Sequence, residues 1–180
     1  MYECALRAAD AGALADLGAC AALSRQTFEA HTTFRFRTQP PCLEYLSLLI
    51  ETALLLRTHR GGRVYVGFER LSNMEPIVAR YLRIADVSER LYVFGVGDWE
   101  PPRHPNMRAI EVAPEVKLAR EWFVVADSPL LRVALVAREE EDGAPTPDAR
   151  NFSAFKSSAP QVVAELAAAA EALVDARLTG

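Results

Sequence analysis

Two short apolar runs decide the fold: Arg-Val-Tyr-Val-Gly-Phe-Glu-Arg at residues 63–70 and Leu-Tyr-Val-Phe-Gly-Val-Gly-Asp at residues 91–98. Both are rich in β-branched and aromatic residues, which favours a buried strand in each. Between them, apolar residues recur at helical spacing over 77–85, and Ser72 with Glu75 has the spacing of a capping box. A helical connection is too long for a hairpin, so we expect two parallel strands in one sheet.

This arrangement predicts a pocket at one edge of the sheet. It brings Glu69 and Arg70 near Asp98, just beyond the carboxyl ends of neighbouring strands, where open α/β sheets usually bind ligands. Arg80 beside Tyr81, and Glu121 beside Trp122, could form a fork for a polar ligand group against an aromatic wall, or could be ordinary structural charges beside core aromatics. The candidate ligand-binding residues are Phe68, Glu69, Arg80, Tyr81, Asp98, Trp99, Glu121 and Trp122.

The C-terminal half predicts more strands and a last helix. Residues 107–112 are a third strand candidate, and the apolar runs 121–126 and 131–137 flank a Ser-Pro turn, which indicates an antiparallel hairpin. A helix is expected to start between Ser158 and Gln161.

The N-terminal part looks mainly helical. Residues 5–30 are rich in alanine with a loose leucine stripe, 32–38 could be an edge strand or an extended linker, and 40–59 begins with two prolines that suit a first helical turn. We therefore expect a single α/β domain with a mixed sheet of about five strands, made of a parallel βαβ core and a C-terminal antiparallel hairpin, flanked by helices. Residues 1–35 would be a helical segment packed on a domain formed by 36–178.

Composition narrows the class of protein. The chain has 180 residues, 51% of them hydrophobic, and a net charge of −4, which fits one globular domain and gives no reason to expect a nucleic-acid partner. Three widely spaced cysteines and the absence of a signal sequence or an apolar run of membrane length predict a cytoplasmic protein.

No catalytic pattern emerges from the residues. Gly95-Val-Gly97 lacks the third glycine of a dinucleotide fingerprint, because that position is Glu100, followed by two prolines. No metal-ligand spacing or nucleophile turn is present, so we expect no enzyme and no metal site, and the cofactor is unknown. An enzyme that uses Glu69 and Asp98 is a weak alternative, since those acids have no partner base or nucleophile.

A DNA-binding regulator is the main alternative to a sensor. Residues 14–28 are similar to a helix–turn–helix, with Gly18 or Leu23-Ser24 near the turn. The expected recognition helix is missing, however, because the Thr-Thr-Phe-Arg-Phe run at 32–36 favours extended structure.

Several short motifs, taken in order, resemble the DICT sensory domain, which is found with diguanylate cyclases and two-component systems. The motifs are Leu46-Ser47, Ile50-Glu51, Gly67-Phe68-Glu69-Arg70, Arg80-Tyr81, Phe94-Gly95, Glu121-Trp122 and Arg150-Asn151-Phe152. The similarity extends from about Phe36 to Leu173. The resemblance implies a non-catalytic sensor module of bacterial signalling proteins with a role in the response to stimuli or light. Together with the expected pocket and the lack of a catalytic pattern, it predicts that the chain binds a small-molecule ligand or a separate signalling protein. With no room for an output domain, the chain would signal through a partner or by association with itself. The broad apolar face of the last helix would either pack in a groove of its own domain or form a homodimer.

Overall fold

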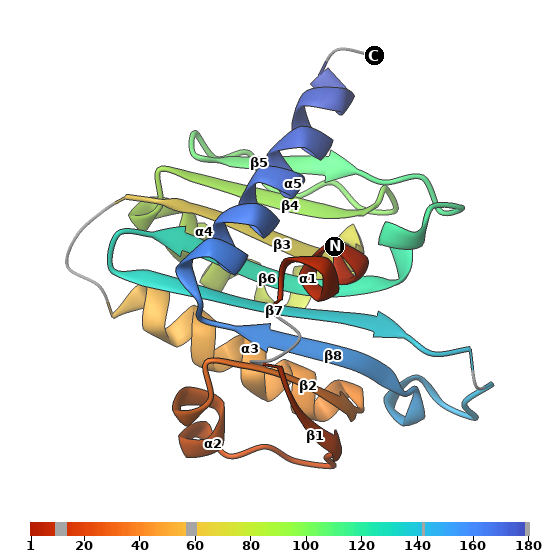
Figure 1. Ribbon diagram of the computed structural model, residues 1–180. Coiled ribbons are helices and arrows are strands. Elements are labelled where there is room, and N and C mark those ends of the chain that lie inside the picture. The colour runs from red at the N-terminus through yellow and green to blue at the C-terminus, as the bar shows by residue number, and fades with distance from the viewer. Residues whose placement is uncertain (10–13, 57–60, 142, 179–180) are drawn as a thin grey trace.

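One mixed sheet of eight strands forms the centre of the computed structural model (Figure 1). The structure describes residues 1–9, 14–56, 61–141 and 143–178. The strands are β1 (Ala15–Ala19), β2 (Thr33–Thr38), β3 (Arg63–Arg70), β4 (Arg90–Val96), β5 (Met107–Glu111), β6 (Glu121–Ser128), β7 (Leu131–Glu139) and β8 (Phe152–Ser157). Their order in the sheet is β1-β2-β8-β7-β6-β3-β4-β5, so the predicted single α/β domain with a mixed sheet is confirmed and the predicted number of strands is too low.

The parallel core matches the expectation from the two apolar runs. β3 and β4 pair in parallel, with Val64 opposite Leu91, and β5 adds a third parallel strand beside β4. The connection is a 3-10 helix, η1 (Leu71–Ile77), followed by α4 (Val78–Val87). The predicted capping box is wrong, because the backbone N–H and the hydroxyl of Ser72 both donate to the carboxylate of Asp98.

The antiparallel half of the sheet is larger than expected. The predicted hairpin is present as β6 and β7, but β8 was missed, and it pairs with both β7 and β2. β2 is therefore an interior strand, and β1 lies at the edge in parallel with it. The alternation in β8 is weakened by small and polar residues (Phe-Ser-Ala-Phe-Lys-Ser), which hides its strand character from a pattern search.

Helices cover both faces of the sheet (Figure 1). On one face lie α1 (Tyr2–Ala8) and α5 (Pro160–Leu178), and on the other lie α2 (Arg25–Ala30), α3 (Pro40–Leu55) and α4. α5 starts where the sequence predicts the last helix. α3 begins at the first of the two prolines, and the expected continuation of α3 over 57–59 lies outside the described residues. The boundary proposed between 1–35 and 36–178 stays a prediction.

The expected helical character of residues 5–30 is wrong in the middle of that range. Residues 15–19 form β1, whose hydrogen bonds to β2 outweigh the helix propensity of its alanines. Within the described residues, the first helix of a helix–turn–helix is consequently absent from 14–28, where only the first four residues of α2 are helical.

Two other expectations concern surfaces. No helix in the described parts of the chain has the length and apolarity that crossing a bilayer requires. On α5, Val162, Leu166 and Val174 are buried in the core, while Leu173 is 37% exposed. Self-association through this helix stays a prediction.

The centre of the sheet carries one tight glycine contact that predicts a stability effect. Gly67 on β3 lies opposite Phe123 on β6, and a Cβ at Gly67 would come within 2.2 Å of the Phe123 ring, which is fully buried. We expect Gly67→Ala to lower the free energy of unfolding by about 2 kcal/mol, because the ring has no free space to enter. Urea denaturation measures this loss, and Gly67→Ala combined with Phe123→Leu should cost less than the sum of the single changes; strict additivity would contradict the steric explanation.

Candidate functional site

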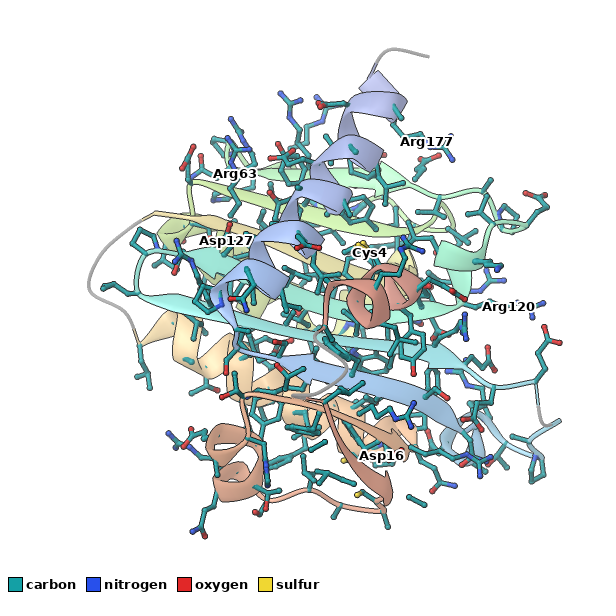
Figure 2. All side chains as sticks on the ribbon, in the orientation of Figure 1. Cys4, Asp16, Arg63, Arg120, Asp127 and Arg177 are labelled. Atoms are coloured by element: carbon teal, nitrogen blue, oxygen red, sulfur yellow. The ribbon has the colours of Figure 1, made fainter. Side chains whose placement is uncertain are left out.

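A cleft of about 510 Å³ opens between α3, the η1–α4 connection and the carboxyl-terminal half of β3. The start of β6 and a short 3-10 helix, η3 (Pro147–Ala149), complete its walls. Figure 2 shows Arg63 and Arg120 at opposite ends of the sheet, and the cleft lies toward the Arg120 end, where β3 finishes and β6 begins. This is the edge of the sheet at which the sequence predicts a pocket.

A bulge in β3 places Glu69 on the cleft wall. Gly67 pairs with Phe94 and Arg70 pairs with Val96, so β3 contains one residue more than β4 over this interval. Glu69 takes up the difference with a φ of 60°, a left-handed conformation that is uncommon for a residue with a side chain and is often found at functional sites.

The carboxylate of Glu69 is held by a guanidinium from a distant part of the chain. It accepts hydrogen bonds from Arg150 Nη1 at 3.0 Å and Nη2 at 3.3 Å, and its side chain is 11% exposed. Burial raises the pKa of the Glu69 carboxyl, while the ion pair with Arg150 acts in the opposite direction. Arg150 also lies 3.4 Å from Glu139 and 5.2 Å above the ring of Phe152, so its guanidinium has several neighbours that fix its position.

A second buried carboxylate, Glu51 of α3, organises the opposite wall. Glu51 is 3% exposed and accepts hydrogen bonds from Arg80 Nη1 at 2.7 Å and from the Tyr81 hydroxyl at 2.5 Å. Burial, reinforced by the neighbouring Glu51, raises the pKa of Tyr81 well above its ordinary range, so this hydroxyl stays a donor at physiological pH. Glu51 is not among the residues selected from the sequence, although an acid on a largely apolar helix face was an available signal.

Three aromatic side chains supply the apolar part of the cleft. Phe68 and Tyr81 pack edge to face, with ring centroids 5.0 Å apart. The indole N–H of Trp122 donates to Ser47 Oγ at 3.0 Å, which fixes the orientation of that ring against α3. Five of the eight residues selected from the sequence line this cleft: Phe68, Glu69, Arg80, Tyr81 and Trp122.

The other three selected residues lie elsewhere. Asp98 accepts hydrogen bonds from Ser72 and Arg70 outside the cleft, and those bonds, chiefly the one from the Ser72 hydroxyl, lower its pKa. The expected proximity of Arg70 and Asp98 is therefore present, but it forms a surface link between β3 and β4. Trp99 lines a separate hollow of about 480 Å³ beside the proline-rich loop.

Glu121 lies on the opposite face of the sheet from Trp122. Its carboxylate contacts the N-terminal amine of Met1 at 2.7 Å and accepts from the backbone N–H of Tyr2 at 3.1 Å. Adjacent residues of a strand alternate between faces, so Glu121 cannot share a wall with Trp122. The carboxylate that faces Arg80 is Glu51, and the proposed fork between Arg80 and Glu121 is wrong.

Among the described residues, no group of three or more His, Cys, Asp or Glu side chains is arranged to hold a metal ion.

Comparison with known proteins places the chain in a family. No curated protein and no solved structure matches the chain. The family model described as "Sensory domain in DIguanylate Cyclases and Two-component system" matches residues 22–140, which is more than half of the chain. The chain therefore belongs to the DICT family of sensory domains.

Proposed function

We propose that this sensory domain binds a small molecule in the cleft between α3, η1–α4 and β3. The observation that carries the proposal is the composition of the cleft: three aromatic rings and several aliphatic side chains surround two hydrogen-bonded ion pairs. Its volume of about 510 Å³ falls in the usual range of small-molecule sites. Membership of a sensory family supports a binding role in signalling rather than catalysis.

The state of the cleft acids also favours binding over chemistry. Glu51 and Glu69 each accept hydrogen bonds from a guanidinium, so neither carboxylate is arranged to take a proton from a substrate. The ion pairs instead fix the positions of α4 and of the segment that contains Arg150. This is the structural role expected in a preformed binding site.

The same contacts offer a route from ligand to signal. The Glu69–Arg150 pair links the bulge of β3 to the segment beside η3, and both sides of the link line the cleft. A ligand that contacts these groups would favour one arrangement of η3 relative to β3. A separate signalling protein would then recognise that arrangement. We place this event in the cytoplasm, since Cys4, Cys20 and Cys42 are free thiols.

A thermal-shift screen of a metabolite library tests the cleft. Leu48 lies on its rim and is 39% exposed, so Leu48→Trp should obstruct the cleft without unfolding the domain. Leu130→Trp is the matched control, because Leu130 is 61% exposed in the β6–β7 turn and does not line the cleft. We expect compounds that raise the Tm of the wild type to lose this effect with Leu48→Trp and to keep it with Leu130→Trp.

Compounds that stabilise the wild type and Leu48→Trp equally would place the binding site elsewhere and refute the proposal. The Tm of each variant without ligand shows directly whether it folds, so a loss of binding is not confused with a loss of structure.

A further inference from the structure

Negative side chains outnumber positive ones in the lining of the cleft. Four carboxylates and two guanidiniums face it, which gives a formal charge of −2; they are Glu44, Glu51, Glu69, Asp148, Arg80 and Arg150. Both guanidiniums are already in ion pairs within the protein, Arg80 with Glu51 at 2.7 Å and Arg150 with Glu69 at 3.0 Å. The excess charge therefore comes from Glu44 and Asp148.

Glu44 and Asp148 lie at the mouth of the cleft on different elements. Glu44 belongs to α3 and Asp148 to η3, and both side chains are exposed. Neither has an ion-pair partner within the part of the chain that the structure describes. The adjoining η3 segment is attached to α3 through Gln39, whose side-chain amide donates to the carbonyl oxygen of Ala149 at 3.5 Å.

The interior beyond these acids suits a flat apolar body. Phe68 and Tyr81 are in edge-to-face contact, and Trp122 is fixed by its hydrogen bond to Ser47. The π faces of such rings attract cations as well as apolar groups, and the effect is largest for tryptophan. Aromatic walls combined with excess carboxylate are the chemistry by which proteins recognise organic cations.

We propose, on the basis of the binding function above, that the cleft selects an amphipathic organic cation. Its apolar body packs against Phe68 and Trp122, and its ammonium group lies toward Glu44 and Asp148. Arg80 and Arg150 serve as positioning residues that hold the walls of the cleft. An anionic ligand is disfavoured, because it would meet the two carboxylates at the mouth and find both guanidiniums engaged.

Three indole compounds that differ in charge test this proposal by isothermal titration calorimetry. They are tryptamine, a cation at neutral pH; tryptophol, which is neutral; and indole-3-acetate, an anion. We expect tryptamine to bind about tenfold tighter than indole-3-acetate, with tryptophol between them, and the difference to shrink as salt screens the exposed acids.

Paired variants assign the preference to the mouth of the cleft. Glu44→Gln with Asp148→Asn should reduce the difference between tryptamine and indole-3-acetate to about twofold and leave tryptophol nearly unchanged. Glu115→Gln with Glu141→Gln removes two exposed acids from a different hollow and should leave the preference intact.

Three results would overturn the proposal: equal affinities, tighter binding of indole-3-acetate, or a preference that survives the change of Glu44 and Asp148. The proposal would also be overturned if none of the three indole compounds binds, while neutral or anionic library compounds bind the wild type and do not bind Leu48→Trp. That result would still support the cleft as the sensory site. If no compound depends on an open cleft, the proposed function and the ligand class both fail.

Discussion

Glu51→Leu is expected to lower the free energy of unfolding by about 3 kcal/mol. Glu51 is 3% exposed and accepts from both Arg80 and the buried hydroxyl of Tyr81. Removal of the carboxylate leaves the tyrosine hydroxyl without its partner and a guanidinium beside an apolar side chain. Loss of one member of a buried ion pair costs roughly 3–5 kcal/mol, and the partial exposure of Arg80 places this case at the lower end.

Urea denaturation at neutral pH measures this loss, and two related variants separate its causes. Glu51→Gln preserves hydrogen-bonding atoms and removes the charge, so we expect it to cost about 1 kcal/mol. Glu44→Gln changes an exposed acid on the same helix and should stay within about 0.5 kcal/mol of the wild type.

A double-mutant cycle identifies the partner of Glu51. In the background of Tyr81→Phe, Glu51→Leu should cost less than in the wild type, because the hydroxyl that it would leave unpaired is gone. A change of less than about 1 kcal/mol for Glu51→Leu alone would show that Arg80 and Tyr81 find other partners, such as water, at no cost. The contacts of Glu51 would then not hold α3 and α4 in place.

One wall of the cleft, the carboxyl end of β3, could be predicted because it follows from topology. Two apolar runs joined by a helical segment lead to parallel neighbours, and parallel neighbours end at the same edge of the sheet. The proximity of Arg70 and Asp98, and the position of Glu69 near the end of β3, follow from this rule. The alternation of side chains along β6 separates Glu121 from Trp122 in the same way and supports the alternative of structural charges beside core aromatics.

The ion pairs of the cleft could not be predicted by the same rule. Glu69 and Arg150 are 81 residues apart in sequence. β7 and β6 separate β8 from β3 in the sheet, but the η3 segment that precedes β8 lines the cleft and brings Arg150 to Glu69. Because β8 was not predicted, the position of the residues that precede it could not be predicted either. The partner of Glu51 depends likewise on how α3 packs against α4, which residue spacing within one helix does not define.

A buried lysine is expected to make stability increase with pH above pH 8. Lys156 on β8 is 2% exposed; its ammonium group donates to the carbonyl oxygen of His31 at 2.6 Å and lies 5.1 Å from the ring centre of Phe28. Burial lowers the pKa of Lys156 from 10.5 to about 8. The native state therefore releases this proton near pH 8, whereas the unfolded chain keeps it until about pH 10.5.

Between these two values the unfolded state holds more protons, so stability gains up to about 1.4 kcal/mol per pH unit from this residue. The contribution is complete above the unfolded pKa and is lost as the pH falls toward 8. Buried tyrosines act in the opposite direction at high pH, because burial raises the pKa of Tyr65 and Tyr81. The effect of Lys156 is therefore measured as the difference between the wild type and Lys156→Met, a change that keeps an unbranched side chain of similar length.

From pH 8 to pH 10, the free energy of unfolding of the wild type should rise by roughly 2 kcal/mol relative to Lys156→Met. Lys117→Met is the control, because Lys117 is exposed and is the other lysine of the chain. Parallel pH profiles for the wild type and Lys156→Met would mean that the native ammonium group keeps its proton as readily as it does in the unfolded chain. Its hydrogen bond to His31 and the rings around it would then compensate fully for the loss of water, and Lys156 would be a charged core residue with no stability penalty.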